Sequence, residues 1–356
     1  MRTQRLAIVG AGPALCCALV LTGCSSSAPN PPASSSNSAA SPTQSQSSQP
    51  SSPSDTPSPT TPAPSTDSPF SGRPGGLGKP VLIVKFDNTP NAQPHSGLTK
   101  ADLVYIEEVE YGLTRLAAVF STDLPSVIGP ARSARISDID LLAQFGKPAF
   151  GYSGSQHKLH PLLAKASIYD VSGDAGGKGW FRDHSRRAPY NFMGRPAVIM
   201  TRAPNASGAA DIGFQFSVDA PAGGSPVKSV TATYPGSSAK FTWNTAHKNF
   251  DIRLNGKPAR ATEGGTQHAT TVVIQYVKQY DSGFGDKFGG RTPMLVTVGT
   301  GKGLVLRDGL VYPVTWSRPI LTGGTTFTGA DGTVVTFAPG QVWVALLNKK
   351  TPAHVV

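Results

Sequence analysis

The sequence contains little cysteine and little charge. Only three of its 356 residues are cysteine, and 15% are Asp, Glu, Lys or Arg. Cys16 and Cys17 lie in an apolar stretch near the N-terminus, and the third cysteine is Cys24. Residues beyond position 24 therefore carry no thiol, which excludes a disulfide scaffold and a Cys-ligated metal site in the folded part.

Long apolar runs are also scarce. Residues 6–20 form the one extended run, which is shorter than the ~20 residues that a membrane-spanning helix needs. This pattern argues against a polytopic membrane protein. Patterned apolar segments do occur beyond residue 80, and they argue against a chain that is disordered throughout.

The N-terminus has the pattern of an export signal. Arg2 and Arg5 precede the apolar run, and residues 21–24 read LTGC. This ending resembles the lipobox of bacterial lipoproteins, which implies a signal peptide over residues 1–23 and a diacylglycerol thioether on Cys24. Two acyl chains suffice for stable anchoring. We therefore expect Cys24 to hold the protein on the extracytoplasmic face of the cell membrane. The alternative is an ordinary secretory signal that contains a cysteine.

A segment rich in Ser, Pro, Thr and Ala follows the lipobox. Residues 24–78 show no hydrophobic period, so they cannot bury enough surface to offset chain entropy. The composition predicts a disordered tether that begins with the lipidated Cys24. At about 5–6 Å × √n, its mean span is ~40 Å.

The net charge belongs to the rest of the chain. The formal charge is +11, and residues 1–71 contribute nothing because Arg2, Arg5, Asp55 and Asp67 cancel. Outside the membrane, a basic surface favours anionic partners such as acidic wall polymers or lipid headgroups. The export signal argues against nucleic acid as a partner. The alternative is that the charge serves only solubility.

Strand and helix patterns alternate over residues 79–205, which predicts an α/β (or α+β) N-terminal domain. The expected strands cover 81–84, ending at Asp87-Asn88, and 103–109, 149–152 and 196–200. A turn at Gly112 leads to the hairpin partner 115–120. Helices are expected from Ser133 or Ser137 to residue 145, and over residues 155–166 with Pro161 near the start.

Residues 206–356 have a β texture, which predicts a mainly antiparallel β C-terminal domain. The dipeptides Asn255-Gly256, Asp308-Gly309 and Asp331-Gly332 can supply the positive φ angles of tight hairpins. The candidate strands cover residues 228–234, 240–243, 250–254, 271–276, 294–298, 304–307, 311–316, 334–337 and 342–347.

One constellation of polar residues in the first domain could carry a binding site. Asp87 and Asn88 end a strand, where open α/β sheets place their sites, and arginines before a predicted helix could hold a carboxylate or phosphate. The alternative is an internal salt-bridge network between the arginines and the glutamates. The members are Asp87, Asn88, Glu108, Glu110, Arg115, Arg132, Ser133 and Arg135.

Several weaker motifs match known chemistry only in part. Residues 150–155 approach the G-x-S-x-G nucleophile elbow around Ser153 but end in Ser155. His157 and His160 could share a helix face, but a zinc site would need a third ligand such as Asp183 or His184. Residues 173–179 lack the spacing of a phosphate loop. We expect no metal and no cofactor.

Aromatic and basic residues follow that loop. Trp180, Phe181 and Arg182, together with Arg186 and Arg187, could form a lip for a glycan or a peptide.

An ordered series of motifs is similar to the YerB-like family of bacterial lipoproteins. It covers residues 80–347 and includes FDN at 86–88, GPARSAR at 129–135 and APYN at 188–191, and then GTGKG at 299–303 and PGQVW at 339–343. The resemblance implies two domains and lipoprotein status without supplying a reaction. The APYN motif adds Asn191 to the candidate ligand-binding residues. Tyr190 stands where many relatives have His, which argues against catalysis at that position.

These features together predict a lipid-anchored cell-envelope protein. We expect a binding or structural module for an anionic wall component or an envelope protein. The alternative is a hydrolase or transferase that acts on wall polymers through Asp87, Glu110 and the arginines. Whether the protein is an enzyme is left open by the sequence.

Overall fold

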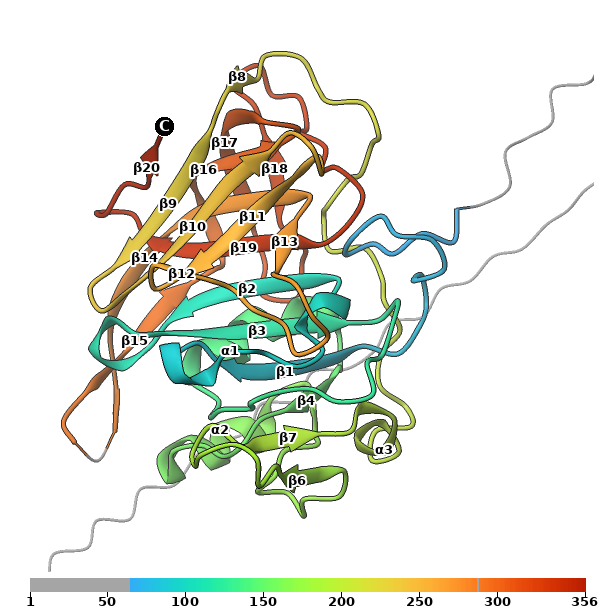
Figure 1. Ribbon diagram of the computed structural model, residues 1–356, viewed down its shortest axis with the longest axis vertical. Coiled ribbons are helices and arrows are strands. Elements are labelled where there is room, and N and C mark those ends of the chain that lie inside the picture. The colour runs from blue at the N-terminus through green and yellow to red at the C-terminus, as the bar shows by residue number, and fades with distance from the viewer. Residues whose placement is uncertain (1–64, 287) are drawn as a thin grey trace, which may run out of the picture. The chain divides into compact units, whose positions relative to one another are not determined.

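The computed structural model describes residues 65–286 and 288–356. The expected signal peptide, the lipidation site Cys24 and most of the expected tether lie outside these residues. The described part is built on two β-sheets, a 12-stranded mixed sheet and a six-stranded sheet, with short helices at one side of the larger sheet (Figure 1). Within it, no helix is both long enough and apolar enough to cross a membrane.

One half of the large sheet comes from the first part of the chain. The β2–β3 hairpin places β1 antiparallel to β3, and β4 runs parallel to β1. Tyr111 and Gly112 form the turn with φ angles of 61° and 67°. The strands expected at 81–84, 103–109, 115–120 and 149–152 and the turn at Gly112 are therefore confirmed. These strands are β1 (Leu82–Asp87), β2 (Leu103–Glu108), β3 (Thr114–Phe120), β4 (Ala149–Gly151) and β5 (Tyr169–Asp170).

The other half comes from the last third of the chain. β19 lies between β14 and β2 and runs parallel to both, so both predicted domains contribute to one sheet. The boundary at residue 205 itself stays a prediction. The strands here are β8 (Ser225–Pro226), β14 (Thr271–Gly285), β15 (Arg291–Val296), β16 (Gly299–Arg307), β17 (Leu310–Arg318), β18 (Thr326–Thr328) and β19 (Val342–Asn348).

The six-stranded sheet packs against the large one through its apolar face. Val230, Phe241 and Ile252 are buried there, and the rings of Phe241 and Trp343 meet edge to face with centroids 6.2 Å apart. Alternation with outward polar residues is the pattern expected of a sheet with one wet face. The strands are β9 (Ser229–Tyr234), β10 (Ser237–Asn244), β11 (Asn249–Leu254), β12 (Lys257–Pro258), β13 (His268–Ala269) and β20 (His354–Val355).

Short helices and 3₁₀ turns surround the β1–β5 half. Leu141 and Leu142 of α1 and Phe145 pack on the face of the large sheet opposite the six-stranded sheet. The mixed first half and the β-rich second half confirm the expected fold class. The helical elements are η1 (Pro90–Ala92), η2 (Leu98–Lys100), η3 (Glu110–Gly112), α1 (Ile136–Leu142), η4 (Ala143–Phe145), η5 (His157–Leu159), α2 (His160–Lys165) and α3 (Pro196–Met200).

Two hairpin turns are as the sequence predicted. Asn255 and Gly256 have φ angles of 52° and 76° between β11 and β12, and Asp308 and Gly309 have 52° and 73° between β16 and β17. Positive φ at both central residues matches the twist of the flanking strands.

Three local predictions were wrong. Residues 196–200 form α3 and not a strand, because Pro196 occupies the first helical turn, where it costs no hydrogen bond. Residues 334–337 make isolated bridges in place of a regular strand, so the turn at Gly332 does not join two strands. Arg135 is the N-cap of α1, in place of Ser133 or Ser137, and the Asp138 carboxylate accepts from its backbone N–H at 2.6 Å.

Ordered structure begins earlier than the predicted tether end at residue 78. Phe70 is buried and packs edge to face on Phe145, with ring centroids 5.2 Å apart. Ser71 and Arg73 both donate to the buried carboxylate of Asp102, at 2.6 and 2.7 Å. These partners are distant in sequence, which is why composition alone placed residues 68–73 in the tether.

The packing between the two sheets gives a stability prediction. Phe241→Ala removes a fully buried ring, and we expect the free energy of unfolding to fall by about 3–4 kcal/mol. Urea denaturation measures this change. Thr242→Ala, on the outer face of the same strand, is the control and is expected to change stability by less than about 0.5 kcal/mol. Similar losses for the two variants would contradict this packing.

Candidate functional site

Alternation along β1 turns an apolar face into a charged one. On the side covered by α1, its inward residues run from Ile83 to Lys85 and then to Asp87, all buried. Register places Arg115 of β3 opposite Asp87 and Glu107 of β2 opposite Arg115. Residues directly opposite on one face of a sheet are close neighbours, so these strands assemble a row of charges at their ends.

Asp87 is the centre of this row. Its Oδ2 accepts from Arg132 Nε at 2.5 Å, and its Oδ1 accepts from the backbone N–H and the hydroxyl of Thr89, each at 2.8 Å. Arg115 Nη1 lies 3.6 Å from Oδ1. Burial by itself would raise the pKa of Asp87, but the charges of Arg115 and Arg132 outweigh it and hold the pKa below its usual value. Asp87 is therefore ionised.

Two guanidinium groups share this single carboxylate. Arg115 is 7% exposed, and burial lowers its pKa to about 10 although Asp87 opposes the change. Its Nε has no hydrogen-bond partner among the described residues. The Arg132 side chain is 25% exposed, and its guanidinium carbon lies 5.7 Å from the centre of the Tyr190 ring. Its two terminal nitrogens donate no hydrogen bond to the described part of the chain.

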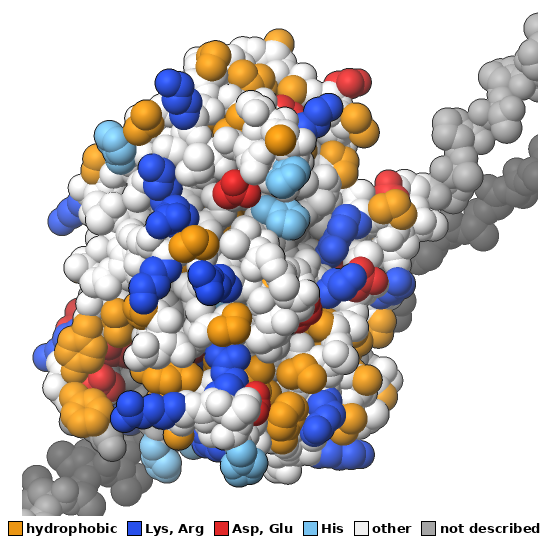
Figure 2. Space-filling view, in the orientation of Figure 1, with side chains coloured by type: hydrophobic (Ala, Val, Ile, Leu, Met, Phe, Trp, Pro, Cys, Tyr) orange, Lys and Arg blue, Asp and Glu red, His pale blue; other side chains and the backbone are white. Residues whose placement is uncertain are grey.

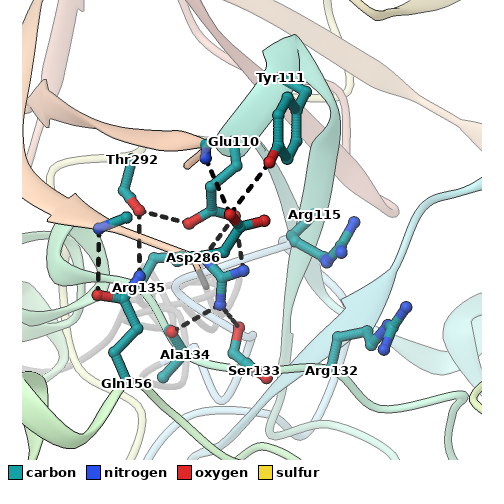
Figure 3. A network of polar contacts seen from close by, with 12 residues as sticks. Glu110, Tyr111, Arg115, Arg132, Ser133, Ala134, Arg135, Gln156, Asp286 and Thr292 are labelled. Carbon is teal, nitrogen blue, oxygen red and sulfur yellow. Dashed lines mark hydrogen bonds and ion pairs between the residues drawn. The ribbon is translucent and has the colours of Figure 1, made fainter. Parts of the chain in front are cut away.

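Glu110 and Arg135 form a second, more complete pair. Arg135 donates to Glu110 Oε2 from Nε at 3.0 Å and from Nη2 at 2.6 Å, and Thr292 donates to Oε1. Burial would raise the pKa of Glu110, but its bonds to Arg135 lower it. Figure 3 shows the guanidinium groups of Arg115 and Arg132 together on one side of this pair.

A third group of charges was missed by the sequence analysis. Lys85 Nζ lies 2.6 Å from Glu107 Oε1 and 2.8 Å from Asp138 Oδ1, and all three side chains are buried. Burial and the Asp138 carboxylate raise the pKa of Glu107 to about 8, well above its ordinary value of 4.5. The sequence feature that could have indicated this group is Lys85 itself, because a lysine interrupts the otherwise apolar run 81–86.

The cluster as a whole sets four cations against four carboxylates. Arg135 and Lys85 each have a carboxylate of their own, whereas Arg115 and Arg132 both face the single carboxylate of Asp87. The cations are Lys85, Arg115, Arg132 and Arg135, and the acids are Asp87, Glu107, Glu110 and Asp138.

The structure separates Asn88 and Asn191 from these arginines. Asn88 follows Asp87 in an extended strand, so it points to the other face, where its Nδ2 donates to Thr114 Oγ1 at 2.7 Å. Its carbonyl accepts from Asn255 Nδ2 and so holds a turn of the second sheet. Asn191 accepts from Arg182 at 2.9 Å between β6 (Trp180–Arg182) and β7 (Phe192–Gly194). Neither amide has a hydrogen bond to Arg115, Arg132 or Arg135.

A pocket of about 830 Å³ lies beside the cluster. Arg186 at its wall is fixed by donating to the carbonyls of Ala92, Pro94 and Tyr190, whereas Arg187 is exposed and makes no ion pair with a described residue. Tyr190 lines the pocket and also lies against Arg132, so it connects the two. The lining residues are Pro90, Asn91, Gln93, Pro94, Asp183, Ser185, Arg186, Arg187, Ala188, Pro189, Tyr190 and Thr262.

The structure gives no support to the partial catalytic and metal motifs. No hydrogen bond joins the Ser153 hydroxyl to any described histidine, and Ser153 lacks the positive φ of a strained elbow. The His157 and His160 rings lie 5.4 Å apart, but the part of the chain that the structure describes has no group of three residues suited to a metal ion.

The loop 173–179 and Trp180, the first residue of the candidate aromatic lip, are held by contacts within the protein. Arg202 donates to the carbonyls of Val171, Ser172 and Ala175 and so fastens the loop 173–179. Trp180 stacks on Phe192 with centroids 5.1 Å apart, and its ring N–H donates to Val171. Trp180 is therefore half-buried and fixed by these two contacts.

Comparisons with known proteins match most of the chain. Residues 72–209 match the family model "Protein of unknown function (DUF3048) N-terminal domain", and residues 230–344 match the corresponding C-terminal domain. The "Putative lipoprotein YerB" of Bacillus subtilis (strain 168) is 26% identical over 280 residues, which cover 76% of this chain and 81% of that protein. The crystal structure of YerB from Bacillus subtilis has the same fold, with a TM-score of 0.69 and 20% identity over 82% of this chain and 99% of that one.

The raised pKa of Glu107 predicts how the stability of the protein depends on pH. Because its pKa is raised above the ordinary value of 4.5, the folded state keeps a proton that the unfolded state loses, so this contribution to stability falls as pH rises from about 4.5 to 8. Glu107→Gln replaces this ionisable group with an amide that does not titrate. We expect the variant to gain stability relative to the wild type across this window, by at most about 1.4 kcal/mol per pH unit.

Urea denaturation at pH 5, 6.5 and 8 measures the effect. Phe241→Ala, which removes no charge, should run parallel to the wild type. A Glu107→Gln profile that is also parallel would show that Glu107 is ionised in the folded protein.

Proposed function

Because this chain belongs to the two-domain DUF3048 family, as its resemblance to YerB-like lipoproteins predicted, we propose that it is a lipid-anchored protein of the cell envelope that binds an anionic wall component. The similar YerB protein of Bacillus subtilis is itself named a putative lipoprotein. The LTGC sequence at residues 21–24 supplies the matching anchor in this chain. Two acyl chains on Cys24 hold the folded part at the extracytoplasmic face of the membrane.

The observation that carries the binding proposal is the sharing of Asp87 by two arginines. The single negative charge of Asp87 can neutralise only one of the two guanidinium groups. A second anion bound beside Asp87 would balance the charge of the other. The terminal nitrogens of Arg132 provide donors in the planar arrangement that suits carboxylate and phosphate groups. Tyr190 and Arg187 extend the site into the neighbouring pocket. The ligand is therefore a carboxylate- or phosphate-bearing wall component.

The state of the carboxylates favours binding over catalysis. A hydrolase or transferase that used Asp87 or Glu110 as its general acid would need that group to hold a proton near neutral pH. Arginines hold the pKa of both below the usual range, and Asp87 accepts hydrogen bonds from Arg132 and Thr89. In this proposal the two acids position the arginines and do not react.

The binding proposal predicts a specific role for Arg132. In Arg132→Gln the full chain, in a neutral detergent, is expected to bind isolated cell walls about tenfold more weakly, since a hydrogen bond to a charged group contributes about 1.5–3 kcal/mol. Co-sedimentation over a range of wall concentrations measures this, and soluble fragments are assayed in the same tubes.

Lys165→Gln is the matched control, because it removes one exposed positive charge from α2 without touching the site. An equal loss in both variants would contradict a site at Arg132. Release of soluble fragments that depends on Asp87 or Glu110 would establish the alternative, an enzyme acting on wall polymers.

The anchor proposal predicts where a variant is found. Cys24→Ala should move the protein from the membrane fraction to the soluble fraction and abolish incorporation of labelled palmitate. Cys17→Ala, inside the expected signal peptide, should change neither. Retention of Cys24→Ala in washed membranes, with label still incorporated, would overturn lipidation at this residue.

A further inference from the structure

The outer face of the six-stranded sheet carries unbalanced positive charge. Residues 225–260 contain six exposed Lys and Arg side chains and a single acid, Asp251. Within the described part of the chain none of the six forms an ion pair. This face therefore holds a large share of the net charge of +11. The six residues are Lys228, Lys240, Lys248, Arg253, Lys257 and Arg260.

Strand register places two of these cations directly opposite each other. Lys240 of β10 pairs with Arg253 of β11, and its partner on the other side is Thr231 of β9. The one acid, Asp251, belongs to a different row and accepts from Asn244 at 2.9 Å. Like charges directly opposite on a sheet destabilise it. A bound anion between Lys240 and Arg253 would remove this repulsion.

The rest of the face is polar. Figure 2 looks onto this sheet and shows Lys and Arg side chains spread over it, with acidic side chains sparse. Thr231 and Thr242 lie between the cations in the strands. None of the exposed large apolar side chains belongs to β9, β10 or β11. A surface of hydroxyls and cations without an apolar anchor suits a hydrated polyanion better than a bilayer.

We propose that the outer face of β9–β12 is a docking surface for a linear wall polymer with repeated phosphate groups. Neighbouring strands lie about 4.8 Å apart, so Lys240 of β10 and Arg253 of β11, directly opposite each other, form a pair of cations that neighbouring phosphates of one polymer can contact. This surface is separate from the Arg132 site, and it would hold a polymer chain by many weak, salt-sensitive contacts.

The test compares two variants with equal loss of charge. Lys240→Gln/Arg253→Gln removes the facing pair, and Lys158→Gln/Lys165→Gln removes two exposed lysines near α2. Binding of the full chain in neutral detergent to immobilised poly(glycerol phosphate) is measured at several salt concentrations. We expect the first variant to bind about tenfold more weakly with a reduced salt dependence, and the second to stay within about twofold of the wild type.

The thermal midpoint of the first variant should equal or exceed that of the wild type, because the repulsion between facing cations is removed. Equal weakening in both variants would reduce the effect to net charge and overturn the proposal. Tighter binding to phosphatidylglycerol vesicles than to the polymer, lost in the same pair variant, would also overturn it, in favour of a membrane surface. Arg132→Gln is measured on the same polymer, because the Arg132 site can itself take a phosphate group. Loss through Arg132 alone would refute this surface while leaving the Arg132 site intact.

Discussion

The parallel pairing of β2 with β19 is the constraint on which the rest of the structure depends. It joins residues 103–106 to residues 342–345, from opposite ends of the folded chain. Gln341 secures the join by donating to the carbonyls of Leu98 and Ala101. This contact joins the two halves of the large sheet, and the joined sheet supplies the apolar face on which the six-stranded sheet packs. Both proposed binding surfaces therefore need the long-range pairing in place.

Local structure could be predicted from the sequence where local physics decides it. Apolar runs and tight turns located β1–β4 and eight of the nine candidate strands beyond residue 206. Long-range pairing could not be predicted, since no local signal says that β19 lies between β14 and β2. At residues 196–200 the local preferences conflict. The β-branched Val198 and Ile199 favour a strand, whereas Pro196 fits the first turn of a helix and Ile199 is buried in the helical conformation that forms.

The site was predicted in part. Residue types indicated that Asp87, Glu110 and the arginines could meet, and the structure brings them together. Asn88 was placed in the site because it follows Asp87 in the sequence. Adjacent residues of a strand face opposite sides of the sheet, so the two side chains point apart. Lys85, Glu107 and Asp138 were missed because each seems an ordinary charged residue until register and the α1 contact place all three in the interior. An isolated lysine within an apolar strand therefore indicates that acidic residues meet it in the interior.

The two proposed surfaces use the same charge in opposite ways. Around Asp87 the cations are buried and held by carboxylates, so Arg115 and Arg132 are ordered before any ligand arrives, and binding there has little entropy to lose. On the outer sheet the cations are exposed and form no ion pair with a described residue, which suits a polymer whose charges arrive in no fixed register. A rigid site can select one chemical group, whereas an exposed basic face raises the local concentration of the polymer that carries it. A protein with both can search a charged matrix by weak contacts and stop where the selected group occurs.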